Sequence, residues 1–302
     1  MNPQLLLMDS DQRSNEHLRG LLHPRFEITV APTMEEAHAF LARQAFDLVI
    51  ADFEILRAAD ANFFQTIHQV QQNLKIGLIS ALDTEHYLAF LLKWRCFHVL
   101  PKLPFYNARD VLLFVENILQ PMNAFGLPRY LADDAEWNRM HIKDRRDKIR
   151  TVEDIVNYFA SCEYEIHELY DVRLIIEEGI NNALFHAFRD DAGREKYRPN
   201  NFCALDPSEE LRLEYGSDAT AIGFSVTDNR GLLTPEQIIS KLSRQYNREG
   251  LFDESGRGLY LARMLSGQII FNIEKGKRTQ IICLFYEKRI NVPKPFSINY
   301  IE

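Results

Sequence analysis

The chain of 302 residues lacks the features that mark several broad classes of protein. No apolar run approaches the roughly 18 residues that a membrane span needs, so we expect no association with a membrane. The formal net charge of -8 argues against a protein that coats nucleic acid, since such proteins usually carry a basic stripe. Because residues 1–4 lead directly into a strand-like run, we also expect no secretory signal.

Cysteine is scarce, and its spacing excludes a zinc-binding or disulfide framework. No Cys-x-x-Cys motif joins the four cysteines, which are Cys96, Cys162, Cys203 and Cys283. This usage is typical of a reducing compartment, so we expect a cytoplasmic protein. With 46% hydrophobic and 26% charged residues, the composition is that of a soluble globular protein long enough for two domains.

The first 120 residues alternate short apolar runs with segments of helical periodicity. The expected strands are 5–8, 28–30, 48–51, 76–79 and 97–100, and the expected helices are 16–22, 34–44, 62–70, 84–94 and 108–119. This alternation predicts an α/β fold with a doubly wound parallel sheet of five strands.

Polar residues follow four of these strands, at the sheet edge where ligands bind in such folds. They are Asp9, Ser10 and Asp11 after the first strand, Asp52 after the third, Ser80 after the fourth and Lys102 after the fifth. Acids, a hydroxyl and an amine at one edge form a site for a cation and a phosphoryl group. Taken singly, each acid is more simply interpreted as a helix cap.

Residues 3–121 resemble the receiver domain of bacterial two-component response regulators, through segments 5–11, 46–52, 79–81 and 99–104. The resemblance implies that Asp52 accepts a phosphoryl group from an upstream histidine kinase and that Mg²⁺ is bound by Asp9, Asp11 and Asp52. It also implies that Ser80 senses the new phosphate and that Lys102 pairs with it. Two positions depart from the family. Ser10 replaces the second of two adjacent acids, which leaves Asp11 as its substitute, and Val99 replaces an aromatic residue.

The segment 174–187 reads as a helix with an apolar stripe and a polar, reactive face. Glu178, Asn182 and His186 are one turn apart on that polar face. A carboxylate and a carboxamide stacked in this way can hold a hydrated divalent cation and orient a nucleophile beside it.

Two later segments carry nucleotide-binding chemistry. Asp228 follows the expected strand 222–227, where its carboxylate can accept a hydrogen bond from an amine such as that of adenine. Gly256 and Gly258 precede the expected helix 260–265, so backbone N–H groups can approach phosphates. Either motif alone is weak, because Asp-Asn-Arg-Gly more often forms a turn. The remaining expected strands are 211–215, 268–274 and 280–286, with a polar insertion at 189–210; they predict an α+β domain with a mixed sheet.

The set of motifs over about residues 130–288 resembles the GHKL (Bergerat-fold) ATP-binding domain, and looks closest to the anti-sigma-factor serine kinases. The resemblance implies that Asn182 holds Mg²⁺, that Glu178 is the general base and that Asp228 accepts a hydrogen bond from adenine. It places Gly231, Gly256, Arg257, Gly258 and Thr279 around the ATP.

The same resemblance has departures. Arg230 and Leu232 replace two glycines of the first glycine box, and Glu177 and Asn181 repeat the spacing of Glu178 and Asn182 one residue earlier. No helical hairpin with a phosphoaccepting histidine lies between the domains, so His141 and His167 are interpreted as structural.

We therefore expect a receiver domain at 3–121, a linker at 122–136, an ATP-binding domain at 137–288 and a tail at 289–302. One hypothesis is a response regulator whose output domain phosphorylates a serine or threonine of an anti-sigma antagonist or similar protein. The other is a non-catalytic module that sequesters a partner such as a sigma factor, with weak or vestigial nucleotide binding. The basic run at 143–148 is interpreted as solvated surface, with a phosphate or partner contact as the alternative. The sequence leaves open whether the chain forms a homodimer.

Overall fold

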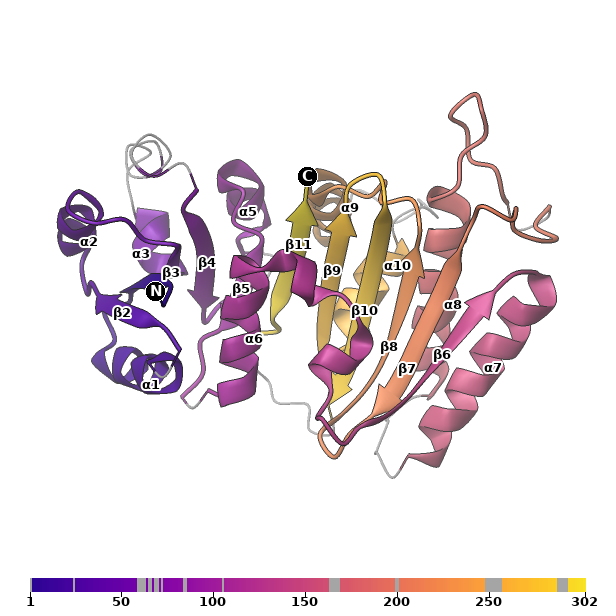
Figure 1. The fold of residues 1–302 in the computed structure, drawn as a ribbon, viewed down its shortest axis with the longest axis horizontal. Helices are drawn as coiled ribbons and strands as arrows, with labels where there is room; N and C mark the ends of the chain where they lie inside the picture. The colour runs from indigo at the N-terminus through magenta and orange to yellow at the C-terminus, as the bar shows by residue number, and fades with distance from the viewer. Residues whose placement is uncertain are drawn as a thin grey trace. The chain divides into compact units, whose positions relative to one another are not determined.

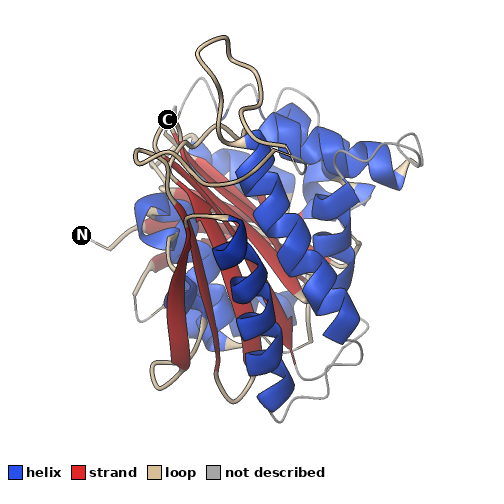
Figure 2. Ribbon diagram, turned by 90° about the vertical axis from the view of Figure 1, so that its right-hand side faces the viewer, coloured by secondary structure: helices blue, strands red, loops and turns tan. Residues whose placement is uncertain are grey.

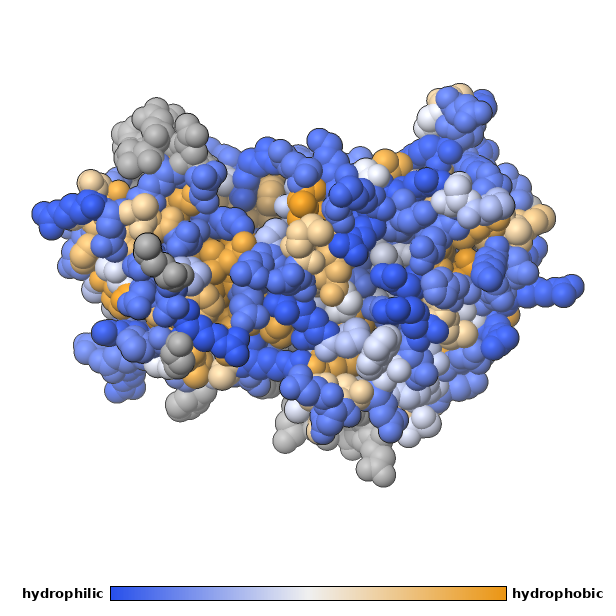
Figure 3. Space-filling view, viewed as in Figure 1, coloured by the Kyte–Doolittle hydropathy of each residue, from blue (hydrophilic) through white to orange (hydrophobic). Residues whose placement is uncertain are grey.

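The computed structural model describes residues 2–23, 25–58, 64, 67, 71, 73–83, 86–104, 106–162, 169–198, 201–247, 257–286 and 293–302. The chain divides into two compact units (Figure 1). The first unit comprises Met1–Asn123 and Asn291–Ser297, and the second comprises Ala124–Ile290 and Ile298–Glu302. Much of the face shown in Figure 3 is hydrophilic, with apolar residues in small groups.

The first unit contains a parallel sheet with strand order β2-β1-β3-β4-β5. The strands are β1 (Gln4–Met8), β2 (Glu27–Val30), β3 (Leu48–Asp52), β4 (Lys75–Ser80) and β5 (His98–Pro101). The helices are α1 (Gln12–Leu22), α2 (Met34–Leu41), α3 (Phe53–Ala58), α5 (Leu88–Trp94) and α6 (Ala108–Leu119). Phe296 and Ser297, which begin β11 (Phe296–Ile301), pair antiparallel with β5, so the sheet is mixed.

Both faces of this sheet are covered, which is why its central strands read as continuous apolar runs. Leu5 and Leu7 of β1 pack in one core cluster with Leu18 of α1 and with Phe114 and Ile118 of α6. The expected helix at 62–70 lies, apart from Phe64 and Ile67, outside the described residues, as do residues 84 and 85 of the expected helix at 84–94.

The second unit contains an antiparallel sheet in the order β9-β10-β8-β7-β6. The strands are β6 (Glu136–Ile142), β7 (Leu211–Ser217), β8 (Ala221–Asp228), β9 (Gln268–Glu274) and β10 (Arg278–Tyr286). The helices are α7 (Arg145–Ser161), α8 (Leu169–His186), α9 (Pro235–Tyr246) and α10 (Arg257–Leu265). The helices lie against the strands in Figure 2, with α8 packed on β8 and flanked by α7 and α10. The expectation of an α/β protein with a mixed sheet is confirmed.

The stretch expected as a linker begins with a segment that is packed against the sheet of the second unit. It includes the short helices η2 (Pro121–Ala124) and η3 (Leu127–Tyr130), and Leu127 and Leu131 are fully buried. The Gly126 amide donates to Gln280 Oε1 at 2.8 Å, and the Leu127 amide donates to Glu214 Oε2 at 2.9 Å. Residues 124–131 therefore act as part of the second unit rather than as a tether. Among the described residues, no helix is both long and apolar enough to span a membrane.

Candidate functional site

The strand ends of the first unit bring two carboxylates and an amine together. Asp9 follows β1, Asp52 ends β3 and Lys102 follows β5. The Lys102 ammonium donates to Asp9 Oδ1 at 2.8 Å and to Asp52 Oδ2 at 2.5 Å. Burial lowers the pKa of Lys102, but the hydrogen bonds and negative charges of Asp52 and Asp9 outweigh it, so the net shift is upward. The lysine is held in its charged form between the two acids.

Asp9 carries the feature of this cluster that points to a cation. Its side chain is fully buried, and its Oδ1 accepts the Asp11 amide at 2.9 Å as well as Lys102. Its Oδ2 is buried with no hydrogen-bond partner in the described part of the chain. A buried carboxylate oxygen without a donor is costly, and oxygen ligands of this kind suit Mg²⁺. Two of the three ligands that the receiver resemblance implies, Asp9 and Asp52, therefore converge with oxygens that fit the cation.

Asp11 and Ser80 are placed differently from those three residues. Asp11 is exposed, and its Oδ1 caps α1 by accepting the amides of Arg13 at 2.9 Å and Ser14 at 3.4 Å. The Ser80 hydroxyl is buried and bonded locally, accepting the Leu82 amide at 3.0 Å. Asp11 thus has the helix-cap role that was the simpler reading of its position.

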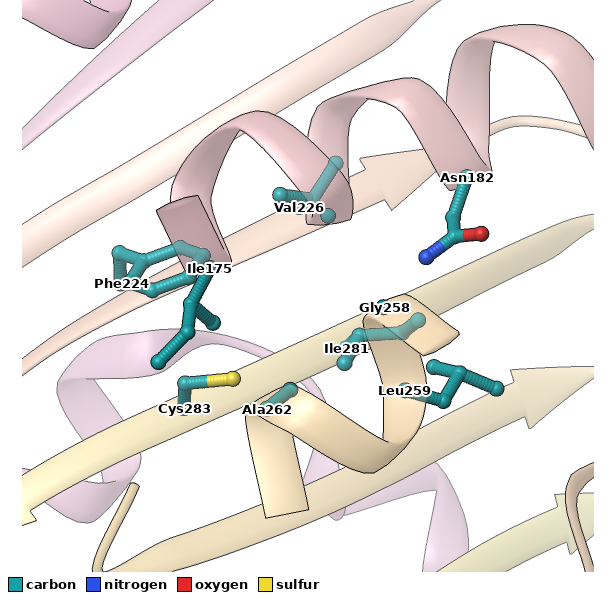
Figure 4. Close-up of a pocket in the computed structure, with 10 residues that line it drawn as sticks. Ile175, Asn182, Phe224, Val226, Gly258, Leu259, Ala262, Ile281 and Cys283 are labelled. Carbon is teal, nitrogen blue, oxygen red and sulfur yellow. The ribbon is translucent and has the colours of Figure 1, made fainter. Parts of the chain in front are cut away.

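In the second unit, Glu178 and Asn182 of α8 lie against the first turn of α10. A Cβ added to Gly258 would lie 2.6 Å from Glu178 Oε2 and 2.9 Å from Asn182 Nδ2. Figure 4 shows the Asn182 amide directed toward Gly258. This approach is possible only for glycine, because any other side chain would occupy the space that the two polar groups use. Gly256 and the side chain of Arg257 lie outside the described residues.

A pocket lies between α8, α10, β8 and β10 (Figure 4). It is lined mainly by apolar side chains, among them Ile175, Phe224, Val226, Leu259 and Ile281. Its volume is about 10 Å³, which is roughly the space for one water molecule. A nucleobase does not fit this space.

Asp228 and Thr279 lie on the face of the sheet that forms the floor of this pocket. The floor contains the cross-strand pair Val226↔Ile281, and the pair Asp228↔Thr279 follows two residues along the strands. Because side chains two residues apart share a face, Asp228 continues the pocket floor at the end of β8. Burial raises the pKa of the Asp228 carboxyl, although hydrogen bonds from the following turn oppose the shift. The Oδ1 atom accepts the amides of Arg230 at 2.8 Å and Gly231 at 3.1 Å.

The altered first glycine box has a structural explanation. Gly231 has φ +62°, and an added Cβ would overlap the Glu274 backbone oxygen, so this glycine is required. Asn229 accepts the Glu210 amide at 3.0 Å and donates to the Ser208 carbonyl oxygen at 2.9 Å. The Arg230 guanidinium lies 5.8 Å from the centroid of the Phe188 ring. Asn229 and Arg230 therefore connect this turn to the end of the polar insertion and to Phe188, the residue just before it.

His186 and His141 each lie near a glutamate, and one charged residue was not singled out by the sequence. His186 lies 2.7 Å from Glu195 Oε1, and His141 lies 3.5 Å from Glu210 Oε1, while His167 is outside the described residues.

Lys148 of α7 reaches α8 and donates to Asn181 Oδ1 at 2.6 Å. The only sequence signal for it was the basic run at 143–148. No group of three His, Cys, Asp or Glu side chains suited to a metal ion is found within the described ranges.

Comparison with known proteins gave one match to a family model and a set of similar solved structures. The model described as the histidine kinase-like ATPase domain matches residues 142–284. The response regulator DrrB of Thermotoga maritima, an OmpR/PhoB homologue, is 15% identical with a TM-score of 0.36, and the match covers 40% of this chain and 54% of DrrB. This chain therefore spans about half the length of DrrB.

Two other structures are similar to the same extent. A CheY-like receiver domain protein of Methanospirillum hungatei JF-1 is 18% identical, with a TM-score of 0.36 and coverage of 42% of this chain and 100% of that one. The receiver domain of an HD domain-containing protein of Pseudomonas fluorescens Pf-5 is 22% identical, with a TM-score of 0.36 and coverage of 41% and 100%. A search of curated proteins gave no match. Residues 142–284 are thus similar to histidine kinase-like ATPase domains, and receiver domains are among the structural neighbours of the chain.

Proposed function

We propose that this protein is a response regulator in which a receiver domain controls a GHKL-type ATP-binding domain, and that the latter is a protein serine/threonine kinase. The observation that carries the proposal is the position of Gly258 against both Glu178 and Asn182, inside the segment that matches the ATPase family model. A partner of the anti-sigma-antagonist type would receive the γ-phosphoryl group of ATP.

The second unit has the groups that such a transfer needs. Asn182 offers an amide oxygen to Mg²⁺, and the first turn of α10 directs backbone N–H groups toward the phosphates. The Asp228 carboxylate, buried beside the pocket floor, accepts a hydrogen bond from the amine of adenine. Glu178 takes the proton of the attacking hydroxyl. Bound Mg²⁺ would neutralise charge on the transferred phosphoryl group.

The first unit would be the switch. Asp52 attacks the phosphorus of a phosphohistidine on the upstream kinase, the phosphorus–nitrogen bond breaks, and the imidazole leaves. Lys102, already bonded to Asp52, would pair with the new phosphate, and Asp9 would hold Mg²⁺ through Oδ2, which has no hydrogen-bond donor among the described residues. Phosphorylation then changes the access of partners to the second unit.

The test is transfer of labelled phosphate from Mg·ATP to a panel of purified anti-sigma-antagonist proteins. Glu178→Ala is expected to abolish transfer and to leave partner binding intact. Glu177→Ala is the matched control, because Glu177 has the same helical spacing but its carboxylate is engaged by Arg173 at 3.2 Å. Equal transfer by wild type and Glu178→Ala would refute the role of Glu178 as base.

A second function is favoured by the small pocket and by the replacement of two glycines with Arg230 and Leu232. In this alternative the second unit is non-catalytic, its nucleotide binding is weak or vestigial, and it sequesters a protein partner such as a sigma factor. Capture of a sigma factor by both wild type and Glu178→Ala, with no ATP binding by either, would select it.

A further inference from the structure

The basic run at 143–148 contains one residue that does not behave as solvated surface. Arg145 and Arg146 are exposed, whereas the Lys148 side chain is half-buried. Asp144 caps the helix that begins in this run by accepting the Arg146 amide at 2.7 Å. The cap fixes the first turn of α7 so that Lys148 faces inward, toward the neighbouring helix.

Lys148 reaches the row of α8 that contains Asn181 and Phe185. Its ammonium donates to Asn181 Oδ1 at 2.6 Å and lies 5.6 Å from the centroid of the Phe185 ring. Asn181 and Phe185 are one turn apart, so the lysine stem runs along one row of α8. Glu178 and Asn182 occupy the neighbouring row, since Glu178 lies three residues before Asn181 and Asn182 three residues before Phe185.

The charge on Lys148 is only partly compensated where it lies. Burial lowers the pKa of its ammonium, Glu177 and Glu178 raise it, and Arg145 lowers it. Glu177 is itself bonded to Arg173. Within the described part of the chain, the hydrogen bond of the ammonium to a side chain is to the neutral amide of Asn181. A partly desolvated cation gains more from an anionic acceptor than from a neutral one.

We propose that Lys148 is a phosphate-binding residue of the nucleotide site on α8. The assignment rests on the proposed function and extends it to a residue outside the motifs of the family. When Mg·ATP is held at Asn182, the flexible four-carbon stem carries the ammonium from Asn181 to a phosphoryl oxygen one helical row away. The ligand group recognised is the polyphosphate, so the base and ribose are not affected by Lys148.

The test is calorimetric titration of the full-length protein with Mg·ATP, Mg·ADP and adenosine. Lys148→Met is expected to weaken Mg·ATP binding about 10- to 100-fold, in line with the loss of a charge-assisted hydrogen bond, and to leave adenosine binding unchanged. Lys148→Arg, which keeps the charge, should retain most of the affinity. Lys143→Met is the matched control, since Lys143 is an exposed member of the same run, and it should bind as wild type does.

A second variant separates phosphate binding from a structural role. Asn181→Ala removes the resting partner of Lys148, so it should keep or raise the affinity for Mg·ATP. If Asn181→Ala instead weakens binding as much as Lys148→Met, or if Lys148→Met weakens all three ligands equally or none, the assignment is wrong. Wild-type protein that binds none of the ligands would overturn the proposed function, and this assignment with it. If the wild type binds Mg·ATP and Lys148→Met binds it with the same affinity, the assignment of Lys148 alone is overturned.

Discussion

Gly258, in the first turn of α10, gives the sharpest perturbation of the proposed nucleotide site. In Gly258→Ala, the new methyl group would lie 2.6 Å from Glu178 Oε2, 2.9 Å from Asn182 Nδ2 and 3.1 Å from Glu178 Cβ. Real Cβ atoms essentially never come closer than 3.0 Å to another heavy atom, so both polar side chains must shift. The substitution therefore acts on the two residues to which we assign the metal and the base.

Two opposing effects set the change in stability. Overpacking of this kind costs about 1–3 kcal/mol. Replacing glycine by alanine within a helix stabilises the helix by up to about 1 kcal/mol. We expect a net destabilisation of the second unit of about 0–2 kcal/mol, which leaves it folded. The displaced Asn182 amide should nevertheless lower the affinity for Mg·ATP by about tenfold or more, or roughly 1.4 kcal/mol.

The assay combines calorimetric unfolding with a titration of Mg·ATP. Gly20→Ala in α1 is the control, because nothing lies within 4 Å of a Cβ added there. It should be neutral or slightly stabilising and should not change nucleotide binding. If Gly258→Ala bound Mg·ATP as wild type does, the contact of α10 with Glu178 and Asn182 would have no part in binding.

Three further perturbations have defined outcomes. Gly231→Ala should prevent stable folding of the second unit, because φ is +62° and the Cβ would overlap backbone; a second unit that melts as in wild type would contradict this. Asp228→Asn should keep the cap on the following turn and change stability by less than about 1 kcal/mol, yet weaken adenine nucleotide binding more than about tenfold, as titration would show. Lys102→Met should destabilise the first unit by about 3 kcal/mol, since it leaves Asp9 and Asp52 without their cation. The pKa of Lys102 is raised above 10.5 in the folded state, so this contribution is complete below pH 10.5 and is lost as the pH rises through the folded value; denaturation across alkaline pH would detect it.

Much of the geometry of the first unit follows from its sequence. Apolar runs and helical segments alternate, so the strands are parallel and their carboxyl ends share an edge. That rule was enough to bring Asp9, Asp52 and Lys102 together. It was not enough for Asp11, because the choice between a metal ligand and a helix cap depends on the direction in which one short side chain turns.

The second unit contains features that its sequence hides. Glu214, Ser225 and Gln280 alternate with apolar residues and so read as a solvent-facing side of the sheet, but all three are buried. They are buried because residues 124–131 cover that face and supply the backbone amides of Gly126 and Leu127 as donors. Such a partner comes from a segment far away in sequence, and periodicity carries no information about it.

The size of the pocket could not be predicted from the sequence either. The resemblance to the GHKL domain predicts Asn182, Asp228 and Gly258 around one nucleotide, but the space between their elements is set by the packing of Phe224, Leu259 and their neighbours. The same holds for Lys148, whose inward direction depends on how α7 packs against α8.

The central claim is that the second unit binds Mg·ATP through Glu178 and Asn182, which lie one turn apart on α8. It is tested most directly by titrating Mg·ATP into the full-length protein and into Asn182→Ala. We expect saturable binding by the wild type that is lost in the variant, with both proteins melting at similar temperatures. No binding by the wild type, or equal binding by both proteins, would contradict the account.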